Sequence, residues 1–389
     1  MTSAKAPIAS AFVEKQRPEH PVLLMCRDTL TQEAHRFLAG FPGTVLYAVK
    51  CNSDSAVLRC LMAAGIRDFD VASLPELQLV KSIDPQARCY FNHPVKTAAS
   101  IGAAWHDHQV TDFVVDCEAE LDKVLEVTGS VGVLIQLRLK AAPGSKVYDF
   151  STKFGMPAET AVTLARRLVA SGVRWALSFH VGSQCEVPAA YEAALEVCAQ
   201  VIAGTGAQPE YVNVGGGFPA QVPGRDIPPP EKFFEQIKAT ADRLHLPRLL
   251  CEPGRGLVWR AGKLAARVML RNDHRLYLND GVYGAMSESN YAKFPIRAEL
   301  LRHRARPAGE ARLFKLFGPT CDSCDAQDEL VMLPDDVSTG DWLLIDDMGA
   351  YSTCLTACFN GFSSDRVELL DAVQFAGEPS GRLATDCPA

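Results

Sequence analysis

The sequence predicts a (β/α)₈ barrel followed by a second, mainly β domain, in a chain of 389 residues. Two observations support this fold class. Short apolar, β-prone runs alternate with segments of helical periodicity up to residue 257, and beyond it the alternation gives way to β-like runs separated by turn residues. Counting such units leaves a doubly wound α/β sheet open as the alternative architecture.

Eight β-like runs make up the first part of the pattern, each four to seven residues long. They cover residues 45–49, 68–72, 89–92, 113–116, 133–139, 176–182, 211–215 and 248–253. The segments between them place apolar residues at helical spacing and end near a glycine, as in SDSAVLRCLMAAG (53–65) and ETAVTLARRLVASG (159–172). A strand followed by a helix, repeated eight times, is typical of a barrel.

The second part of the chain is read as strands joined by turns. The β-like runs there cover residues 262–272, 274–280, 311–318, 328–334 and 341–348. We expect an exposed connector at 304–312 and a frayed tail from Gly377. The predicted division is a barrel of residues 38–257 and a β domain built from residues 1–37 and 258–389, which contributes to a dimer and to the active site.

The composition excludes several classes of protein. The formal net charge is −7 and no basic patch is visible, which argues against a nucleic-acid-binding surface because phosphates are bound by Lys and Arg. No apolar run reaches the roughly 18 residues of a membrane span. The first residues carry neither the basic nor the apolar region of a secretory signal, so we expect a cytoplasmic protein acting on a small molecule.

The cysteines predict neither a disulfide framework nor a metal site. There are 13, an odd number scattered along the chain, as expected of a reducing compartment. Only Cys321 and Cys324 form a CxxC pair. A structural zinc site needs a second ligand pair, and Cys354 with Cys358 is spaced one residue wider, so no metal is predicted.

Polar residues follow the β-like runs where a barrel enzyme has its active site, at the C-terminal ends of the strands. These residues are Lys50, Asn92, Asp116, Arg138, His180, Gly215 and Glu252. A lone histidine such as His180 is more often structural than catalytic. Here, however, polar or glycine positions recur together on one rim, which predicts a functional site there.

Two glycine-containing segments predict a phosphate site on the same rim. VGGGFP (214–219) and EPGRG (252–256) follow the last two barrel runs, where this fold usually binds a phosphate through backbone N–H groups. A glycine-rich loop alone is a weak signal. Together with Lys50 and Glu252 it indicates pyridoxal phosphate, with a lysine for the Schiff base, glycines for the phosphate and a carboxylate for the pyridine nitrogen.

The motifs in their order along the chain resemble a known family. Between residues 47 and 362 the sequence reads YAVKCN, FDVAS, HVGSQ, VGGGFP, EPGRG, GPTCDSCD, GAYS and FNGF. It is thereby similar to the pyridoxal-phosphate-dependent ornithine/lysine/arginine decarboxylases of the alanine-racemase-like fold. The resemblance implies the (β/α)₈ barrel with a C-terminal β domain, and a head-to-tail homodimer with active sites at the interface.

The resemblance also implies roles for individual residues. Lys50 would form the Schiff base with the cofactor, Glu252 would pair with the pyridine nitrogen, and His180 would stack on the ring. Asp70 would lie near the cofactor, while Arg138 with Lys153 would support the site and a mobile loop around 141–151. The residues that would hold the phosphate are Ser183, Gly217, Gly254, Arg255 and Tyr351.

The GPTCDSCD motif implies a contribution from a second subunit. Cys321 would enter the partner's site and return a proton to Cα after decarboxylation, and Asp322 would line the pocket for the distal amine of the substrate. This role explains the CxxC pair better than a metal does. The resemblance assigns no role to Cys324, and packing is the reading we adopt for it.

One departure concerns the substrate. Ornithine decarboxylases carry a further aspartate, between a DGVYG-like motif and GPTCD, that faces the distal ammonium of the substrate. In this chain the segment reads GVYGAMSESNYAKFP, and its only acidic residue is Glu288. Ala292 or Asn290 stands near the expected position. A buried ammonium without a carboxylate partner is poorly tolerated, so the departure bears on substrate choice.

Three functions are compatible with these residues. The first is decarboxylation of L-ornithine, L-lysine or a related diamino acid, with Glu288 or Asp322 serving the amine. The second is decarboxylation of an amino acid with a larger, acylated or otherwise uncharged side chain, in a specialised biosynthetic pathway. The third is a non-catalytic homologue that regulates polyamine metabolism by binding a partner. The presence of Lys50, His180, Glu252 and Cys321 argues against the third.

Overall fold

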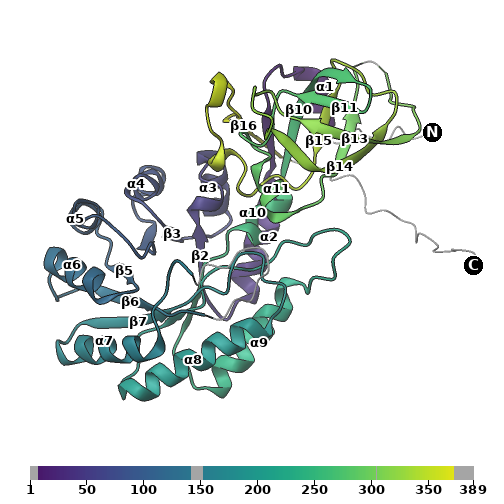
Figure 1. The fold of residues 1–389 in the computed structure, drawn as a ribbon. Helices are drawn as coiled ribbons and strands as arrows, with labels where there is room; N and C mark the ends of the chain where they lie inside the picture. The colour runs from purple at the N-terminus through teal and green to yellow at the C-terminus, as the bar shows by residue number, and fades with distance from the viewer. Residues whose placement is uncertain (1–7, 142–151, 304, 372–389) are drawn as a thin grey trace, which may run out of the picture.

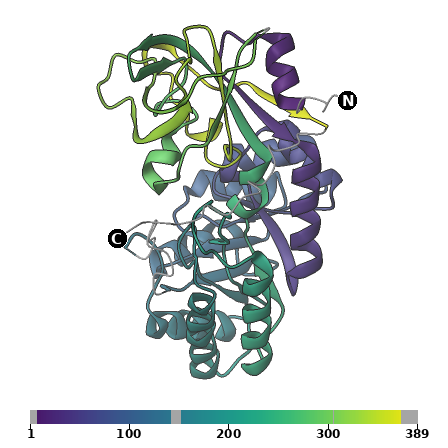
Figure 2. The ribbon, with the colours of Figure 1, turned by 90° about the vertical axis from the view of Figure 1, so that its right-hand side faces the viewer.

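The fold is described from a computed structural model that covers residues 8–141, 152–303 and 305–371. The loop predicted around 141–151, beyond Ala141, and the tail predicted from Gly377 lie outside these residues. Figures 1 and 2 show two bodies, with the barrel strands and their helices in one and a curled β-sheet in the other.

Eight parallel strands close into a barrel in the order β2 to β9. Their bounds are β2 Gly43–Ala48, β3 Asp68–Val71, β4 Arg88–Phe91, β5 Asp112–Val115, β6 Leu134–Arg138, β7 Arg174–Ser178, β8 Val212–Asn213 and β9 Leu249–Cys251. The pairing of β2 with β9, as in Val45 opposite Cys251, completes the ring. The predicted barrel is therefore confirmed, and the doubly wound alternative is wrong, because an open sheet would leave two edge strands unpaired.

Helices surround the barrel and return the chain to the start of each following strand (Figure 1). They are α2 Arg27–Gly40, α3 Ser55–Ala63, α4 Leu74–Ile83, α5 Ala98–His106, α6 Glu118–Thr128, α7 Ala158–Ala170, α8 Ala189–Thr205 and α9 Pro230–Arg243. Their starts follow local chemistry. Helix α4, for example, is capped by Ser73 Oγ, which accepts from Glu76 N, while Glu76 accepts from Ala72 N at 2.7 Å. Among the described helices, none combines the length and the apolar character that crossing a membrane requires.

The inside of the barrel is built in layers that follow from the two-residue period of a strand. Leu46, Tyr90, Leu134, Ala176, Tyr211 and Leu250 form a buried apolar cluster of their own. The residue two positions further along a strand points to the same face, toward the C-terminal end of the barrel. From Tyr90, Tyr211 and Leu250 this step leads to Asn92, Asn213 and Glu252. The polar residues therefore lie one layer above the apolar cluster, at the C-terminal rim of the barrel.

The second body is a sheet that contains both ends of the described chain. Its main path runs β12-β15-β10-β11-β13-β14, and β1 pairs with β10 and with β16. The bounds are β1 Val22–Cys26, β10 Gly262–Asn272, β11 Arg275–Leu278, β12 Ala298–Leu301, β13 Ala311–Phe317, β14 Ala326–Pro334, β15 Trp342–Ile345 and β16 Val367–Leu370. Figure 2 shows the first helix, α1 (Ile8–Gln16), beside this sheet. The predicted domain boundaries after residues 37 and 257 remain a prediction.

Short elements complete the second body and its junction with the barrel. They are α10 Arg255–Val258, α11 Ser287–Ala292 and the 3-10 turns η1 Val49–Cys51, η2 Trp259–Ala261, η3 Thr353–Leu355 and η4 Phe359–Gly361. The connector predicted at 304–312 is too long, because β13 begins at Ala311, which pairs with Pro334 of β14. Residues 311 and 312 also belong to the predicted β-like run 311–318, and that run corresponds to β13.

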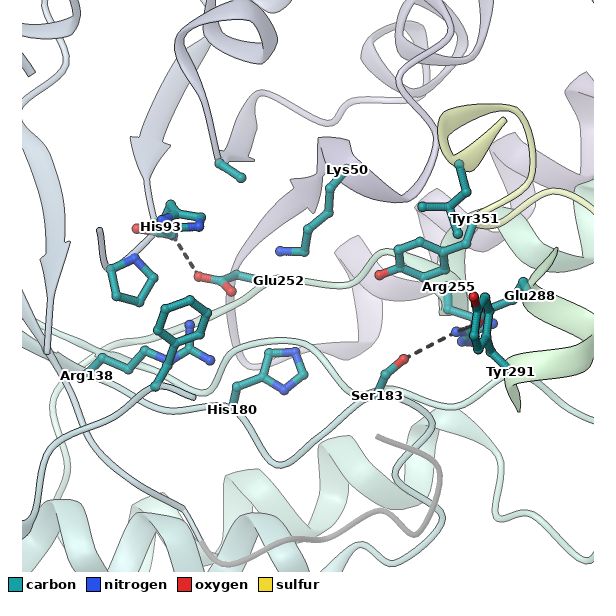
Figure 3. Close-up of a pocket in the computed structure, with 15 residues that line it drawn as sticks. Lys50, His93, Arg138, His180, Ser183, Glu252, Arg255, Glu288, Tyr291 and Tyr351 are labelled. Atoms are coloured by element: carbon teal, nitrogen blue, oxygen red, sulfur yellow. Dashed lines mark hydrogen bonds and ion pairs between the residues drawn. The ribbon is translucent and has the colours of Figure 1, made fainter. Parts of the chain in front are cut away.

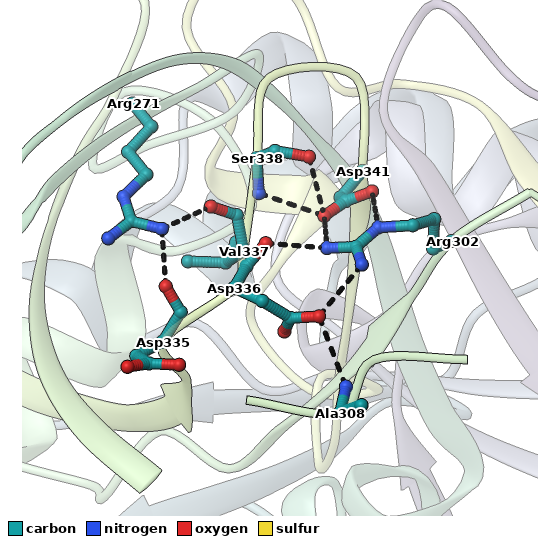
Figure 4. A network of polar contacts seen from close by, with 8 residues as sticks. All are labelled: Arg271, Arg302, Ala308, Asp335, Asp336, Val337, Ser338 and Asp341. Atoms are coloured by element: carbon teal, nitrogen blue, oxygen red, sulfur yellow. Dashed lines mark hydrogen bonds and ion pairs between the residues drawn. The ribbon is translucent and has the colours of Figure 1, made fainter. Parts of the chain in front are cut away.

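An arginine network fixes the turn between β14 and β15 (Figure 4). Arg302 donates to both carboxylate oxygens of Asp341, at 2.9 and 2.8 Å, and to Asp336 Oδ2 at 2.9 Å. Asp341 also accepts from the backbone N–H of Ser338 at 2.9 Å. Such a two-pronged guanidinium–carboxylate contact has defined geometry, so it holds the end of β12 against this turn.

Candidate active site

A cavity of about 470 Å³ opens at the C-terminal ends of the barrel strands. The predicted residues that line it are Lys50, Asn92, Arg138, His180, Ser183, Glu252, Arg255, Glu288 and Tyr351. In the view of Figure 3, Glu252 and Arg138 lie toward one end, Ser183, Arg255 and Tyr351 lie toward the other, and Lys50 and His180 lie between them. The structure therefore brings together residues that are up to 301 positions apart, from Lys50 to Tyr351.

Lys50 lies in the single 3-10 turn that follows β2. Its Nζ is 2.7 Å from Asp70 Oδ2, and this pairing follows from strand register because Ala48 lies opposite Asp70. Burial opposes the charged form of the amine, but the carboxylates of Asp70 and Glu252 outweigh it, so the pKa of Lys50 lies above its usual value. The side chain is 43% exposed because it projects into the open cavity.

Glu252 follows β9 and is held by amide side chains. Its Oε1 accepts hydrogen bonds from Asn92 Nδ2 and Asn213 Nδ2, both at 2.6 Å. Gln136 Nε2 in turn donates to Asn92 Oδ1 at 2.6 Å, and Asn213 Nδ2 also donates to Gln136 Oε1 at 3.1 Å. Burial and the nearby Asp70 raise the pKa of Glu252 above its usual value, against the opposing charge of Lys50.

His180 follows β7 and has a neutral imidazole. Its Nδ1 accepts a hydrogen bond from the backbone N–H of Gly182 at 3.0 Å, which assigns the remaining ring proton to Nε2. Burial, followed by the charges of Arg138 and Lys50, lowers the pKa of His180 well below its usual value. A flat, uncharged ring therefore forms one wall of the cavity (Figure 3).

Arg138 ends β6 and lies among aromatic and acidic groups. Its guanidinium carbon is 5.3 Å from the ring centre of Phe154. Burial lowers the pKa of Arg138, while the carboxylates of Glu252, Asp116 and Asp70 favour its charge. Arg138 thus adds a cation at the same end of the cavity as the Glu252 carboxylate.

The opposite end of the cavity is built around Arg255, which is 4% exposed. Its Nη2 donates to Ser183 Oγ at 3.3 Å and forms an ion pair with Glu288. Its Nε and Nη1 are buried and have no hydrogen-bond partner among the described residues. Because buried donors are nearly always satisfied, these two nitrogens, with three N–H bonds between them, indicate an anion that belongs at this end.

Two predicted phosphate-site residues, Gly217 and Tyr351, have backbone conformations with positive φ. Gly217 has φ +101°, and a Cβ there would lie 2.6 Å from the carbonyl oxygen of Gly182, so only glycine fits. Tyr351 has φ 54°, which is uncommon for a residue other than glycine, and its N–H donates to the carbonyl of Cys51 at 2.8 Å. That bond ties the Tyr351 loop to the neighbour of Lys50.

These residues fit pyridoxal phosphate. The cofactor requires an amine for its aldehyde, a carboxylate for its pyridine nitrogen and hydrogen-bond donors for its phosphate. The cavity supplies all three, with Glu252 toward one end, the unsatisfied donors of Arg255 toward the other and Lys50 between them. Gly217 and Gly254, predicted to hold the phosphate, are packed so closely that a Cβ at either position would lie within 3.0 Å of a neighbouring atom.

Other residues with predicted roles do not line this cavity of the single chain. Asp70 instead pairs with Lys50, and Gly217 and Gly254 are not among the lining residues. Cys321 is exposed. Asp322, beside it, accepts hydrogen bonds from the hydroxyl of Tyr283 and from the backbone N–H of Cys324. Ala292 is 1% exposed and belongs to the hydrophobic core. Lys153 lies 5.0 Å from the ring centre of Phe154, at the edge of the site.

Sequence reasoning missed two groups of residues in the site. Gln136 and Asn213, which complete the amide network around Glu252, could have been found as polar residues within the apolar runs VLIQLRL and YVNVG. His93, Phe154, Tyr291 and Leu355 lie in loops or short elements and carry no such signal, although they line the cavity. Loop residues reach a barrel site only through the folded chain.

Comparison with known proteins gives concordant results. Residues 27–259 match the family described as pyridoxal-dependent decarboxylase, pyridoxal binding domain. The decarboxylase flvG of Aspergillus flavus is 33% identical over 366 residues, which are 87% of this chain and 81% of that protein. Rat ornithine decarboxylase is 31% identical, over 85% of this chain and 76% of its own length.

A solved structure is similar over nearly the whole fold. The lysine/ornithine decarboxylase of Vibrio vulnificus, complexed with putrescine, superimposes with a TM-score of 0.81 at 30% sequence identity. The match covers 95% of this chain and 99% of that one. The similarity therefore includes both the barrel and the β-sheet that follows it.

Proposed function

The chain belongs to the pyridoxal-dependent decarboxylase family, and we propose that it removes the α-carboxyl group of an L-amino acid whose side chain resembles that of ornithine or lysine but does not end in a free ammonium. The activity class and the pyridoxal phosphate cofactor follow from the family. The single observation that carries the substrate proposal is that Glu288, the one acidic residue of the segment GVYGAMSESNYAKFP, is ion-paired with Arg255.

The catalytic roles that we propose divide between the two ends of the cavity. Bound at Lys50, the cofactor supplies a ring that accepts the electron pair left by CO₂. Glu252, held by Asn92 and Asn213, would keep a proton on the ring nitrogen. His180, neutral and flat, would support the ring face without adding a charge that opposes that proton.

The phosphate would be held at the Arg255 end. Arg255 offers two buried donor nitrogens, Nε and Nη1, that lack partners among the described residues, and Ser183 lies within hydrogen-bonding distance of its Nη2. Gly217 and Gly254 would contribute backbone N–H groups, and Tyr351 its hydroxyl.

We further propose a homodimer with shared active sites. Cys321, exposed and outside the cavity of its own chain, would enter the site of the partner subunit and return the proton to Cα. Asp322 would accompany it and line the substrate pocket. A residue that must touch the reacting atoms but lies outside its own cavity requires such an exchange between two copies.

The substrate proposal rests on the charges of the cavity wall. The lining residues with carboxylates are Glu252, bonded to two amides, and Glu288, paired with Arg255. The wall also has apolar and aromatic residues, among them Pro94, Phe154, Tyr291 and Leu355. In the proposed dimer a substrate ammonium would therefore meet one carboxylate, that of Asp322, in place of two. Loss of one partner from a desolvated charge pair costs about 2–5 kcal/mol, which is roughly 30-fold to several thousand-fold in recognition.

The test compares matched pairs of substrates by CO₂ release. L-Ornithine is compared with Nδ-acetyl-L-ornithine and L-lysine with Nε-acetyl-L-lysine, so that only the distal charge changes within a pair. We expect kcat/KM to be higher for the acetylated member by about 30-fold or more. The wild-type protein alone decides this comparison.

The variant Glu288→Gln separates the two readings of the same pocket. If the wild type prefers free ornithine or lysine and Glu288→Gln loses that preference, Glu288 is the amine partner and the uncharged-substrate proposal is wrong. If the preference for free diamino acids is instead lost in Asp322→Asn, the single carboxylate of the partner subunit suffices, and the proposal is equally wrong.

A further inference from the structure

The ion pair between Arg255 and Glu288 lies inside the molecule. The Arg255 side chain is 3% exposed and the Glu288 side chain 9%. Two aromatic rings flank the same guanidinium, whose carbon lies 5.1 Å from the ring centre of Phe294 and 5.0 Å from that of Tyr351. Glu288 and Phe294 both belong to helix α11 or the residues directly after it. This short segment therefore contributes two contacts to one arginine.

Helix α11 is itself fixed to strand β14. Asn290 Nδ2 donates to the carbonyl of Ala326 at 2.9 Å, and Asn290 Oδ1 accepts from the N–H of Asp328 at 2.9 Å. Gln327 Nε2 donates to the carbonyl of Met286, just before the helix, at 3.3 Å. Side-chain hydrogen bonds join the helix to the sheet on both sides of Glu288, so the position of its carboxylate is fixed by the surrounding structure.

We propose that Glu288 is a positioning residue for the phosphate group of the cofactor and that it acts by orienting the guanidinium of Arg255. The inference rests on the proposed role of Arg255 as a phosphate ligand. Arg255 Nη2 is directed to Glu288 and Ser183, and this leaves Nε and Nη1 as the donors that have no partner among the described residues. Glu288 is then occupied by Arg255 rather than by a substrate ammonium.

Two effects of the Glu288 carboxylate oppose each other. Its negative charge lowers the attraction of this end of the cavity for a dianion, whereas its hydrogen bond removes rotational freedom from a long side chain before the ligand arrives. Removing it would leave Nη2 with a weaker set of partners, since Ser183 at 3.3 Å would be its remaining partner among the described residues. We therefore expect the orienting effect to dominate.

The experiment measures binding of pyridoxal phosphate and of pyridoxal to the cofactor-free protein by absorbance titration. Pyridoxal lacks only the phosphate. For Glu288→Ala we expect about tenfold weaker binding of pyridoxal phosphate, because the Arg255 side chain must then be ordered when the ligand binds. Binding of pyridoxal should be unchanged. Glu288→Gln keeps an acceptor for Arg255 and should stay within about threefold of wild type for both ligands.

Controls keep the result interpretable. Ser289→Ala changes the next residue of the same helix and should bind both ligands as wild type does. Thermal unfolding of each variant identifies general damage to the fold, which would weaken both ligands alike. Arg255→Ala tests the premise, because it must weaken pyridoxal phosphate far more than pyridoxal if the arginine holds the phosphate.

The outcomes separate the inference from its premise. Equal loss of pyridoxal phosphate and pyridoxal in Glu288→Ala, tighter binding of pyridoxal phosphate in that variant, or a Glu288→Gln variant as weak as Glu288→Ala would each overturn the orienting role. If Arg255→Ala discriminates against pyridoxal phosphate and Glu288→Ala does not, only the role of Glu288 is wrong. If Arg255→Ala fails to discriminate, the phosphate assignment itself is wrong.

Discussion

Lys50 shows how a single residue acquires its chemistry from the end of a strand. The chain leaves β2 in one 3-10 turn, and register with β3 brings Asp70 to 2.7 Å from the amine. We expect the purified protein with pyridoxal phosphate to absorb visible light, because the cofactor would be joined covalently to Lys50. Borohydride reduction should abolish that band and leave the label on the peptide that contains Lys50.

The neighbouring lysine provides the control for this prediction. Lys153 lies at the edge of the same cavity, 5.0 Å from the Phe154 ring centre, and should carry no label. Lys50→Ala should neither bind the cofactor covalently nor release CO₂ from any substrate. A label on another lysine, or a protein that gains no absorbance with added cofactor, would show that Lys50 is not the attachment point.

At the scale of elements, the turn between β11 and α11 depends on a buried carboxyl group. Asp280 is 1% exposed, and its Oδ1 accepts from the N–H groups of Gly281 at 2.7 Å and Ala285 at 3.0 Å. Burial raises the pKa of Asp280 to about 7, and the nearby Asp325 carboxylate adds to the shift, against hydrogen bonds from Ser364 and the backbone. The folded state therefore keeps a proton on this carboxyl at pH values where the unfolded chain has lost it.

The sign of the pH effect follows from linkage. Asp280 contributes stability below its ordinary pKa near 4, and that contribution is lost as the pH rises through about 7. Between these limits the free energy of unfolding falls by up to about 1.4 kcal/mol per pH unit from this group. The unfolding temperature of wild type should therefore exceed that of Asp280→Asn at pH 5, and the difference should be smaller at pH 8.

An exposed aspartate serves as the control for the pH series. Asp226→Asn removes a carboxylate from a surface loop and should shift the unfolding temperature equally at both pH values. Parallel curves for wild type and Asp280→Asn across this range would mean that Asp280 is ionised in the folded state throughout, contrary to the prediction.

At the scale of the whole molecule, the positions of Lys50 and Cys321 predict complementation between subunits. Lys50 lines the cavity, whereas Cys321 is exposed elsewhere on the chain. Mixing inactive Lys50→Ala and Cys321→Ala proteins should give mixed dimers with one intact site each. Activity should approach about a quarter of wild type, because random exchange makes about half of the dimers mixed and one of two sites works in each.

Subunit exchange must be demonstrated independently, for example by mixing two differently labelled wild-type preparations. Mixing Lys50→Ala with a Lys50→Ala, Cys321→Ala double variant is the matched negative control, because no combination of those chains restores a site. No recovery in the first mixture, despite exchange, would place both residues in the site of one chain and exclude the shared arrangement.

Much of the fold was predictable from the sequence because the pattern that specifies it is local. All eight barrel strands lie within or beside the predicted runs, since each run combines β-prone residues with a glycine or polar boundary. The rim residues Lys50, His180 and Glu252 were predictable for the same reason: a polar residue at the end of an apolar strand occupies the active-site end of any barrel. Their roles came from the resemblance of the motifs.

Contacts between distant segments were decided by the tertiary structure alone. Strands β1 and β16 pair across more than 340 residues, as Leu23 with Val367 does. No local sequence pattern around either strand indicates this pairing. The ion pair between Glu288 and Arg255 joins two segments whose separation depends on how the sheet sits against the barrel. The sequence by itself determined where charged, apolar and turn-forming residues lie along the chain. Which of them meet depended on barrel closure and sheet packing, because burial energy depends on the whole enclosed surface and not on any one stretch of chain.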